Sequence, residues 1–599
     1  MKPIEDENAD TPLGAWGRAL AMTAPISRNI STTFPTLIES FADRFGSAPA
    51  LLSDQGCVSY RELAERCNRY SCWALAQGLA AGDVVCLVML NCPDYLAIWL
   101  GITRIGGIVA LINTNLIGNE LVHAINLVAP RHLIVGGELV EALADVLPQL
   151  ASTVRCWAHG ELSHGFPRID HEIEHGCVGR LRRSVHATPP LITDQALYIF
   201  TSGTTGLPKA ANVSHYRLMQ WSHWFAGMMD TRSSDRMYNC LPMYHGIGGV
   251  AAVGATLVNG GSVVLRQRFS ASRFWDEVVD WHCTLIQYIG ELCRYLVQSP
   301  PHPRETNHQI RLCCGNGLSA NVWQAFQRRF RISRILEFYG ATEGNFALWN
   351  CEGEPGSIGR IPLFLGHRFP VALIKCDLDT GEPMRTEEGR CVRCSANEVG
   401  EAIGKIIEDG SQPASRFEGY TDHEAAETKI LRDAFAEGDA WFRSGDLMRR
   451  DRRGYFYFVD RMGDTFRWRG ENVSTTQVAD TITACAGVIE AVVYGVTIPK
   501  TEGRAGMAAI AVSRDFDLSV LHQYLAARLP EYARPLFLRV RDAIETTGTF
   551  KPKKRELSRD GYDPTATGDP LYFYDRNRAA FVKLDAALYE RIRAGNLRL

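Results

Sequence analysis

Short runs of apolar, mostly β-branched residues alternate with amphipathic helical stretches along most of this chain. Val84–Leu90, His132–Val135 and Val263–Leu265 are such runs. Runs without polar alternation are typical of parallel strands that are buried on both faces, and such strands need helical crossovers between them. The pattern therefore predicts an α/β fold with largely parallel sheets.

The start of one helix has a clear signal in the sequence. The segment Ser59-Tyr-Arg-Glu62 has the spacing of a capping box, in which two side chains satisfy the free N–H groups of a helix start. Leu63, Cys67, Tyr70 and Ala74 follow at helical spacing. We expect an amphipathic helix that begins at this box.

Composition excludes several classes of protein. The chain has 599 residues, 46% hydrophobic and 22% charged, with 64 Lys+Arg against 67 Asp+Glu and a net charge of −3. These values are ordinary for a globular protein of several domains and exclude a disordered chain, a fibrous repeat and a disulfide miniprotein. Near-neutral charge also argues against a nucleic-acid binder, and we expect no nucleic-acid partner.

Cysteine usage and the N-terminal residues favour a reducing compartment. Seventeen cysteines are too dilute for a disulfide scaffold, and Met1–Asn8 is polar where a signal peptide would be apolar. Cys391-Val-Arg-Cys394 is the only CxxC pair, and we interpret it as a strand with buried cysteines rather than a redox or zinc site. We expect free thiols and a cytoplasmic protein.

Neither of two long apolar stretches is predicted to span a membrane. Tyr95–Ile112 carries Arg104 at its centre, which costs about 2.5–3.5 kcal/mol on insertion. Gly248–Leu265 contains glycines and Asn259 in the pattern of a turn. Peripheral contact with the inner face of a membrane stays open.

A domain boundary is predicted near residue 460. The strand-like alternation of Gly454–Asp460 stops at the short polar segment Arg461–Asp464. A second αβ pattern begins after it, with Val488–Val496 as a strand and Leu518, Leu521, Leu525 and Leu529 as a helix face. We expect an N-terminal domain over residues 1–460, a hinge at 461–464 and a C-terminal domain over 465–599.

The strongest chemical signal is Tyr198-Ile-Phe-Thr-Ser-Gly-Thr-Thr-Gly-Leu-Pro-Lys209. An apolar strand leads into a loop of hydroxyls and glycines that ends in a lysine. Glycines let backbone N–H groups turn toward an anion, hydroxyls add donors, and a lysine supplies positive charge. The pattern predicts a phosphate-binding loop, although it is not a Walker A sequence.

The loop resembles the phosphate-binding loop of the adenylate-forming enzymes, which include acyl-CoA synthetases, luciferases and peptide-synthetase adenylation domains. The resemblance extends from about residue 35 to the end of the chain. Its further motifs are Phe338–Asn345, Ser444–Asp446, Asp460–Arg461 and Gly470–Asn472. Finer features resemble the branch of fatty-acid transport proteins and very-long-chain acyl-CoA synthetases: Asn113–Leu116, Gly315–Leu318, Phe466–Ser474 and Thr547–Lys551.

The resemblance implies a fold and a reaction. The fold is α/β with some β-barrel content, built as a large N-terminal adenylation domain and a small mobile α+β C-terminal domain. In the reaction a carboxylic acid and ATP give acyl-AMP and pyrophosphate, and the thiol of CoA then displaces AMP. ATP, Mg²⁺ and CoA are the implied cofactors.

The resemblance also assigns roles to residues. Glu343 would bind Mg²⁺, Thr342 the α-phosphate, and Asp446 with Arg461 the ribose. Lys551 would steady the charge at phosphorus during adenylation. Residues implied to bind the phosphates are Thr201, Ser202, Gly203, Thr204, Thr205, Gly206 and Lys209, with Thr204 also implied in catalysis. Residues implied to bind adenine are Gly315, Asn316, Gly317, Tyr339 and Gly340, and pantetheine would pass Gly470.

Some positions depart from the family pattern or stay ambiguous. Phe550 stands before Lys551 where glycine is usual, Ala210 follows the loop lysine, and Gly463 occupies the position of a hinge Asp or Lys. His245 would line the carboxylate pocket, but a core histidine is the alternative. The nearby glycines either leave volume for an acyl chain or let a helix pack closely, and the sequence does not separate these two; they are Gly246, Gly248, Gly249 and Gly254.

The expected substrate is a long- or very-long-chain fatty acid. Alternatives within the same chemistry are a bulky steroid or bile-type acid and a short polar carnitine-type acid. A rival of another class is a membrane-associated fatty-acid uptake protein that acts by binding. The sequence leaves the acyl chain length and the choice between monomer and homodimer open.

Overall fold

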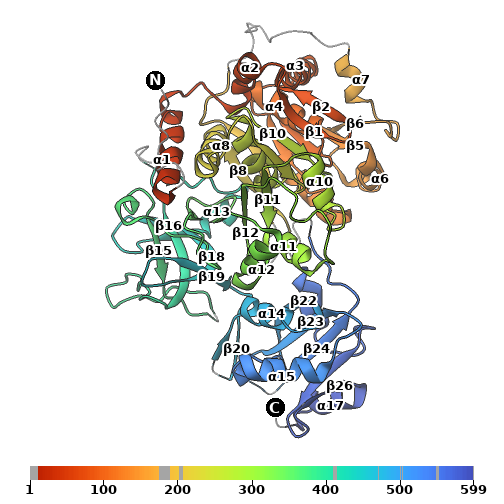
Figure 1. The fold of residues 1–599 in the computed structure, drawn as a ribbon, viewed down its shortest axis with the longest axis vertical. Coiled ribbons are helices and arrows are strands. Elements are labelled where there is room, and N and C mark those ends of the chain that lie inside the picture. Colours follow the sequence, from red (N-terminus) through yellow and green to blue (C-terminus); the bar gives the residue numbers. More distant parts are fainter. Residues whose placement is uncertain are drawn as a thin grey trace. The chain divides into compact units, whose positions relative to one another are not determined.

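The computed structural model describes residues 11–174, 189–201, 207–378, 380–408, 415–469, 471–499, 501, 503–547 and 552–597 (Figure 1). These residues form two compact units. The first unit runs to Phe369 and includes Lys405–Leu431, and the second comprises Pro370–Gly404 and the chain from Arg432 onwards. Each unit has its own sheets and its own hydrophobic core.

A six-stranded sheet in the first unit confirms the predicted parallel strands. Its order is β6-β5-β3-β4-β7-β8, in which β7 and β8 are antiparallel and the other neighbours are parallel. The strands are β3 (Val84–Val88), β4 (Ile108–Leu111), β5 (His132–Gly136), β6 (Arg155–His159), β7 (Gln195–Thr201) and β8 (Lys209–Ser214).

Helices cover this sheet on both faces. The core that includes α3 and α4 lies on one face, and the apolar cluster that includes α5 and α6 lies on the other. The predicted capping box is present, because α3 begins after Ser59, whose side chain and that of Glu62 accept each other's backbone N–H. The helices are α3 (Tyr60–Ala76), α4 (Pro93–Arg104), α5 (Gly118–Leu127), α6 (Val140–Ala144) and α7 (Ile169–Glu174).

An eight-stranded sheet forms the other half of the first unit. Its order is β14-β13-β12-β11-β9-β10-β1-β2, parallel except at the β13–β14 and β1–β2 edges. The third predicted run is its strand β10. The strands are β1 (Pro49–Ser53), β2 (Gly56–Ser59), β9 (Arg236–Asn239), β10 (Ser262–Leu265), β11 (Leu285–Ile289), β12 (Leu312–Asn316), β13 (Ile335–Gly340) and β14 (Ala347–Asn350).

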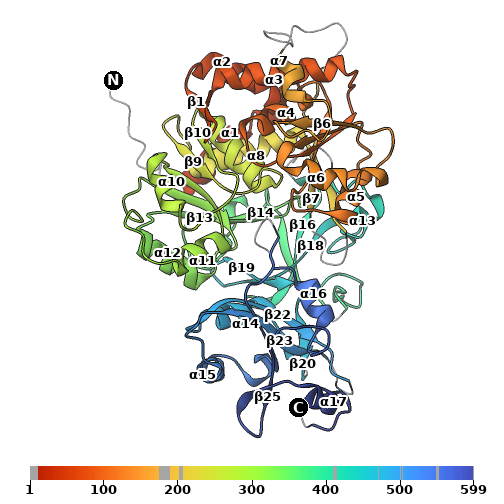
Figure 2. The same ribbon diagram turned by 90° about the vertical axis from the view of Figure 1, so that its right-hand side faces the viewer.

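One hydrophobic core joins the two sheets of the first unit. It contains residues of β3, β4 and β7, residues of β9 to β13, and helices between them such as α8 and α9. Figure 2 shows α10, α11 and α12 beside β9 and β13. The helices are α1 (Pro12–Thr23), α2 (Phe34–Phe45), α8 (His215–Met229), the π-helix Gly246–Ala251, α9 (Ala252–Leu257), α10 (Phe274–Asp280), α11 (Gly290–Gln298), α12 (Ala320–Phe330) and α13 (His423–Glu427).

Close contacts in the structure explain why three positions in or near the π-helix must be glycine. A Cβ on Gly249 would lie 1.9 Å from the carbonyl oxygen of Met243, and one on Gly254 would lie 2.1 Å from Ser222 Oγ. A Cβ on Gly248 would meet the carbonyl oxygen of Pro242 at 2.5 Å. Close packing of the chain therefore explains these three positions. Gly246 alone of the four has ordinary space, with the nearest atom 3.4 Å away in the Trp221 ring.

The second unit begins with the half-barrel sheet that the resemblance implied. In this sheet β15 pairs antiparallel with β16, and β18 pairs antiparallel with β19. Its strands are β15 (Val371–Ile374), β16 (Val399–Lys405), β18 (Ala440–Arg450) and β19 (Phe456–Arg461), while β17 (Ile430–Arg432) lies at the boundary of the two units in the chain.

A second sheet with its own core completes this unit. The order β22-β23-β24-β25-β26 confirms the predicted strand Val488–Val496, and the predicted helix face is present in α15. The elements are β20 (Phe466–Trp468), β21 (Glu471–Val473), α14 (Thr475–Thr483), β22 (Val488–Val496), β23 (Ala505–Val512), α15 (Leu518–Arg528), β24 (Phe537–Arg541), α16 (Lys554–Asp560), β25 (Leu571–Asp575), β26 (Ala580–Lys583) and α17 (Ala586–Arg593). Short 3₁₀ helices in the chain are Ile26–Arg28, Gly137–Leu139, Leu147–Gln149, Leu363–Leu365 and Glu531–Ala533.

Two further sequence interpretations can be compared with the structure. Among the described residues no helix is long and apolar enough to cross a membrane, as predicted for both apolar stretches. Cys391 and Cys394 are free thiols, and burial raises the pKa of Cys394 to about 11, opposite to the shift of a reactive thiolate. Most described cysteines are free, but Cys72 is disulfide-bonded, so the expectation of free thiols fails there.

Candidate active site

The phosphate-loop motif lies at the end of an antiparallel hairpin in the first unit. Strand β7 ends at Thr201 and β8 begins at Lys209, and these two residues face each other in the strand register. Ala210 is fully buried, so the residue after the lysine packs into the sheet. Several predicted site residues lie outside the described residues: Ser202, Gly203, Thr204, Thr205, Gly206, Gly470 and Lys551.

A buried tyrosine joins the two ends of this hairpin to the predicted metal ligand. Tyr420 pairs through its backbone with Ala211 on β8, and only 5% of its surface is exposed. Its hydroxyl donates to Glu343 Oε1 at 2.7 Å and shares a hydrogen bond with the Thr201 side chain. Lys209 Nζ lies 5.6 Å from the centre of its ring. Because burial raises the pKa of Tyr420, the phenol stays protonated and keeps its donor.

The position of Glu343 suits a ligand for a hard cation. It follows β13 at the carboxyl end of the parallel strands, where ligands of open α/β sheets bind. Tyr420 uses one carboxylate oxygen, and each carboxylate oxygen can accept more than one interaction. Mg²⁺ is usually held by one or two carboxylates together with phosphates, so a single glutamate beside a phosphate loop fits this ion.

A buried arginine fixes the turn that carries Thr342. Arg217 on α8 donates to the carbonyl oxygen of Thr342 at 2.8 Å and to that of Arg416 at 3.3 Å. Its Nε lies 3.6 Å from Glu418 Oε2, and Glu418 accepts in turn from the hydroxyl and backbone N–H of Ser214. Two segments far apart in the sequence are thus held against the start of α8.

Tyr420 and Arg217 were missed by the sequence analysis. Arg217 had a signal, because it is the only Lys, Arg, Asp or Glu within His215–Met229. A lone charge in an apolar helix is rarely buried without partners. Tyr420 comes after Gly419 in a segment without a periodic pattern, and its position depends on pairing with β8, which lies about 210 residues earlier in the chain.

The predicted adenine residues meet at one edge of the eight-stranded sheet. Strands β12 and β13 are parallel neighbours, so their carboxyl ends lie together. Gly315 and Asn316 end β12, Gly317 follows it, and Tyr339 and Gly340 end β13. Tyr339 packs its ring against Phe346, with centroids 5.7 Å apart.

The glycines at this edge meet different structural requirements. A Cβ on Gly315 would lie 2.2 Å from the carbonyl oxygen of Tyr288 and 2.6 Å from its ring. Gly317 has a φ of +79°, a conformation that favours glycine. A Cβ on Gly340 would have its nearest neighbour 3.8 Å away, so this glycine has an open face against which a flat base could lie.

His245 is not a buried core histidine. It is half-buried and directly precedes the π-helix Gly246–Ala251. Its ring lies 4.6 Å from the ring of Tyr244, whose hydroxyl accepts from Asn115 Nδ2 at 2.9 Å. Single-turn π-helices occur often at functional sites. The alternative of a satisfied core histidine loses its basis, whereas the pocket role stays a prediction.

In the second unit, Asp446 and Arg461 lie close to each other. They face each other across β18 and β19, with Arg461 Nε 3.7 Å from Asp446 Oδ1. The turn before Asp446 is held by Glu401, which accepts from the N–H of Gly445 at 3.1 Å, while Ser444 Oγ donates to the carbonyl oxygen of Ala402. The Asp446 carboxylate is mostly covered, with 15% of the side chain exposed.

The predicted hinge segment is tied closely to helices α14 and α16. Asp460 is buried and accepts from the N–H of Thr475 at 2.6 Å, at the start of α14. Lys554 Nζ, at the start of α16, donates to Asp464 Oδ2 at 2.9 Å and to Thr475 Oγ1 at 3.0 Å. Gly463 has a φ of +91°, which proline cannot adopt, so proline there would strain even this conformation.

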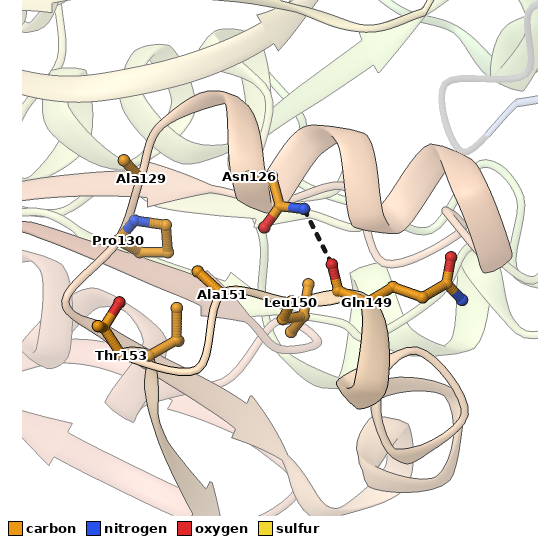
Figure 3. A pocket seen from close by; sticks show the side chains of 8 residues that line it. Asn126, Ala129, Pro130, Gln149, Leu150, Ala151 and Thr153 are labelled. Atoms are coloured by element: carbon orange, nitrogen blue, oxygen red, sulfur yellow. Dashed lines mark hydrogen bonds between the residues drawn. The ribbon is translucent and has the colours of Figure 1, made fainter.

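A pocket of about 390 Å³ lies elsewhere in the first unit, at the end of α5 (Figure 3). Asn126 Nδ2 donates across it to the carbonyl oxygen of Gln149 at 3.2 Å. None of the predicted site residues lines it, and its lining has no ionisable side chain. The lining residues are Asn126, Ala129, Pro130, Gln149, Leu150, Ala151, Thr153 and Val154.

Two family profiles match the chain. The profile described as AMP-binding enzyme matches residues 38–392, and that described as AMP-binding enzyme C-terminal domain matches residues 477–551. Mouse long-chain fatty acid transport protein 1 is 40% identical over 580 residues, 96% of this chain and 89% of that protein. Human long-chain fatty acid transport protein 3 is 40% identical over 87% of this chain and 76% of that protein.

Solved structures share the fold at low sequence identity. A benzoate CoA ligase from Burkholderia xenovorans matches with a TM-score of 0.73 and 20% identity, over 88% of this chain and 100% of that chain. ATP-bound MatB from Rhodopseudomonas palustris matches with a TM-score of 0.72 and 22% identity, over 88% and 99%. The mixed α/β architecture with a smaller C-terminal part is therefore confirmed.

Tyr420→Phe tests whether the buried phenol serves Glu343. The variant keeps the ring near Lys209 but removes the hydroxyl, so it should lower ATP–pyrophosphate exchange about 10-fold and raise the Mg²⁺ concentration needed for half-maximal exchange. Tyr589→Phe is the matched control, because Tyr589 donates to Asp563 at 2.9 Å in the second unit. Unchanged exchange in Tyr420→Phe, or an equal loss in Tyr589→Phe, would contradict the role given to Tyr420.

Proposed function

Because the chain belongs to the AMP-binding enzymes and, among them, to the group of the long-chain fatty acid transport proteins, we propose that it is an ATP-dependent acyl-CoA ligase for long- or very-long-chain fatty acids. The observation that carries the proposal is the convergence of Thr201, Lys209 and Glu343 on Tyr420. The two ends of a phosphate-loop motif beside a carboxylate suited to a metal ion are what adenylation requires.

The first step joins two anions. A carboxylate oxygen attacks the α-phosphorus of ATP, a new P–O bond forms, and the bond to pyrophosphate breaks. Lys209 offers positive charge to the phosphates, and Thr342, held by Arg217 through its carbonyl, donates to the α-phosphate. Glu343 would hold Mg²⁺, which neutralises charge on the phosphates when bound.

The second step needs no covalent nucleophile from the protein. The thiol sulfur of CoA attacks the acyl carbon, the bond to AMP breaks, and the thiol proton passes to solvent. We propose Asp446 and Arg461 for the ribose, because an acid can accept from both ribose hydroxyls. The adenine would lie against Gly340 and the Tyr339 ring, with Gly315 and Gly317 shaping the neighbouring turn.

The acyl substrate is the finer part of the proposal. It is supported by relatives whose names specify long-chain fatty acids. A steroid or bile-type acid and a carnitine-type acid remain the same-chemistry alternatives. A panel of C2 to C26 acids and sterol acids, scored by thioester formation, separates them. The highest kcat/KM is expected at long chain length, and a preference for a sterol or short polar acid would replace the proposed substrate.

A protein that only binds fatty acids for uptake is the rival of another class. The presence of Lys209, Glu343, Asp446 and Lys551 argues against it, because a binding protein needs none of this ATP chemistry. The discriminating observation is AMP release that depends on both fatty acid and CoA. AMP release without that dependence, or none at all, would favour the rival.

Peripheral membrane contact is a further part of the proposal. It is supported by a short 3₁₀ helix in which Leu363 is fully exposed and Phe364 is 59% exposed, while Leu365 is buried beneath them. The exposed Arg368 follows this tip, which suits anionic headgroups. A location in the cytoplasm stays a prediction.

Co-sedimentation with phosphatidylserine-containing vesicles tests this contact. Replacing both Leu363 and Phe364 with Ser should lower vesicle binding at least about 10-fold, because two large apolar side chains no longer enter the interface. Leu162→Ser, at a residue that is 68% exposed, is the control and should bind as the parent protein does. Equal binding by all three proteins would place the contact elsewhere or remove it.

Rotation of the C-terminal domain between the two steps completes the proposal. Lys551 would act in adenylation and then leave, with residues 461–464 absorbing the change of backbone angles. Lys551→Ala should lower acyl-AMP formation by about 10²–10³ but leave conversion of supplied acyl-AMP and CoA to thioester largely intact.

Lys553→Ala is the matched control for that test. Lys553 is two residues away, and its Nζ is 3.9 Å from Glu545 with 52% of the side chain exposed. Both half-reactions should stay near normal in this variant. If Lys551→Ala lost both half-reactions equally, Lys551 would be needed throughout and the proposed division of steps would be wrong.

A further inference from the structure

A buried glutamate that the proposed mechanism does not use lies beside the adenine edge. Glu337 on β13 is 1% exposed. Its Oε1 accepts from the N–H of Leu318 at 3.0 Å, and the N–H of Gly317 also donates to its carboxylate. Its Oε2 accepts from the hydroxyl of Tyr288, which is fully buried on β11. All three donors point at one carboxylate inside the sheet.

The three strands place these groups in one row. Tyr288 is the register partner of Gly315, and Gly315 is the register partner of Glu337. The tyrosine side chain can reach across to Glu337 because Gly315 has no Cβ, which would lie 2.6 Å from the tyrosine ring. The missing side chain of Gly315 on β12 therefore leaves room for the contact between Tyr288 on β11 and Glu337 on β13.

The turn after β12 is held from a second side as well. A Cβ on Gly290, at the start of α11, would lie 1.8 Å from the carbonyl oxygen of Gly317. The peptide units of Gly317 and Leu318 are thus fixed by the carboxylate through their N–H groups and by close contact through a carbonyl. Few turn conformations satisfy both restraints.

Burial of an ionisable side chain at such a position costs stability. Burial raises the pKa of Glu337 to about 8, although hydrogen bonds from Tyr288, Leu318 and Gly317 act to lower it. A buried polar group of this kind is strongly destabilising if a partner is removed, and it fixes geometry when all its partners are present. Its partners here are the backbone of the predicted adenine turn.

We propose that Glu337 and Tyr288 are positioning residues that fix the turn Asn316–Leu318 in the shape that receives the adenine ring of ATP. The inference rests on the proposed function, since it assigns a purpose to the turn within that reaction. Neither side chain needs to touch the nucleotide. Loss of either side chain should therefore weaken binding of the adenine base and leave binding of the phosphates and of the acid unchanged.

A second tyrosine of the same sheet pairs with a glutamate on helix α10, which allows a strict control. Tyr238 on β9 is fully buried and donates to Glu277 Oε2 at 2.7 Å, and Glu277 is 7% exposed. Tyr238 is the register partner of Ile286, two residues before Tyr288, so both tyrosines lie on the same face of the sheet. Glu277, however, binds Arg266 and not the adenine turn.

The experiment compares Tyr288→Phe with Tyr238→Phe. Binding of ATP and of inorganic tripolyphosphate is measured by calorimetry in the presence of Mg²⁺. Tyr288→Phe should weaken ATP binding about 10-fold and leave tripolyphosphate binding unchanged, since only the adenine turn is released. Tyr238→Phe should change neither. In turnover, Tyr288→Phe should raise the KM for ATP while the KM for the fatty acid stays constant.

A second pair of variants keeps the test decisive if Tyr288→Phe folds poorly. Glu337→Gln keeps a carbonyl oxygen for the two backbone N–H groups and should bind ATP within about threefold of the parent protein, whereas Glu337→Leu should lose ATP binding at least about 10-fold. Equal ATP binding by Glu337→Leu and the parent, or parallel losses for ATP and tripolyphosphate, would overturn the inference. A parent protein that binds no ATP would overturn the proposed function and this inference with it.

Discussion

A carboxylate and a triphosphate repel each other, and the proposed reaction must hold them within bonding distance. The first unit supplies the groups for this at one place, with Lys209, Thr201 and Glu343 gathered around the buried phenol of Tyr420. Charge and donors fixed before the reaction stabilise the transition state without reorganisation, which water cannot do. The hairpin β7–β8, the turn after β13 and the segment around residue 420 are linked by this cluster and by the contacts of Arg217 and Glu418.

Sequence reasoning predicted the features that local pattern determines. The parallel strands and the capping box at Ser59 are both present. It did not find Tyr420 or the Tyr288–Glu337 pair, because each depends on contacts between segments that the fold alone brings together. The glycines illustrate the same limit: the sequence left two explanations, and contacts with backbone at Gly248 and Gly249 and with the Ser222 side chain at Gly254 decided for close packing.

The fold by itself says little about the acid. A benzoate CoA ligase has the same architecture at 20% identity, so the fold alone does not specify a fatty acid. This chain is 40% identical to mouse long-chain fatty acid transport protein 1, and it has an apolar tip at Leu363 and Phe364. An acid that partitions into membranes and a protein surface suited to membrane contact are chemically consistent with each other.

The proposed reaction requires that a carboxylate oxygen of the acid attacks the α-phosphorus of ATP. It is tested most directly by running one turnover with a long-chain fatty acid that carries ¹⁸O in its carboxylate, in unlabelled water, with CoA present. Mass spectrometry of the products then locates the label. The account predicts one ¹⁸O atom in AMP and none in pyrophosphate. Label in inorganic phosphate or pyrophosphate, or unlabelled AMP beside newly formed thioester, would contradict it.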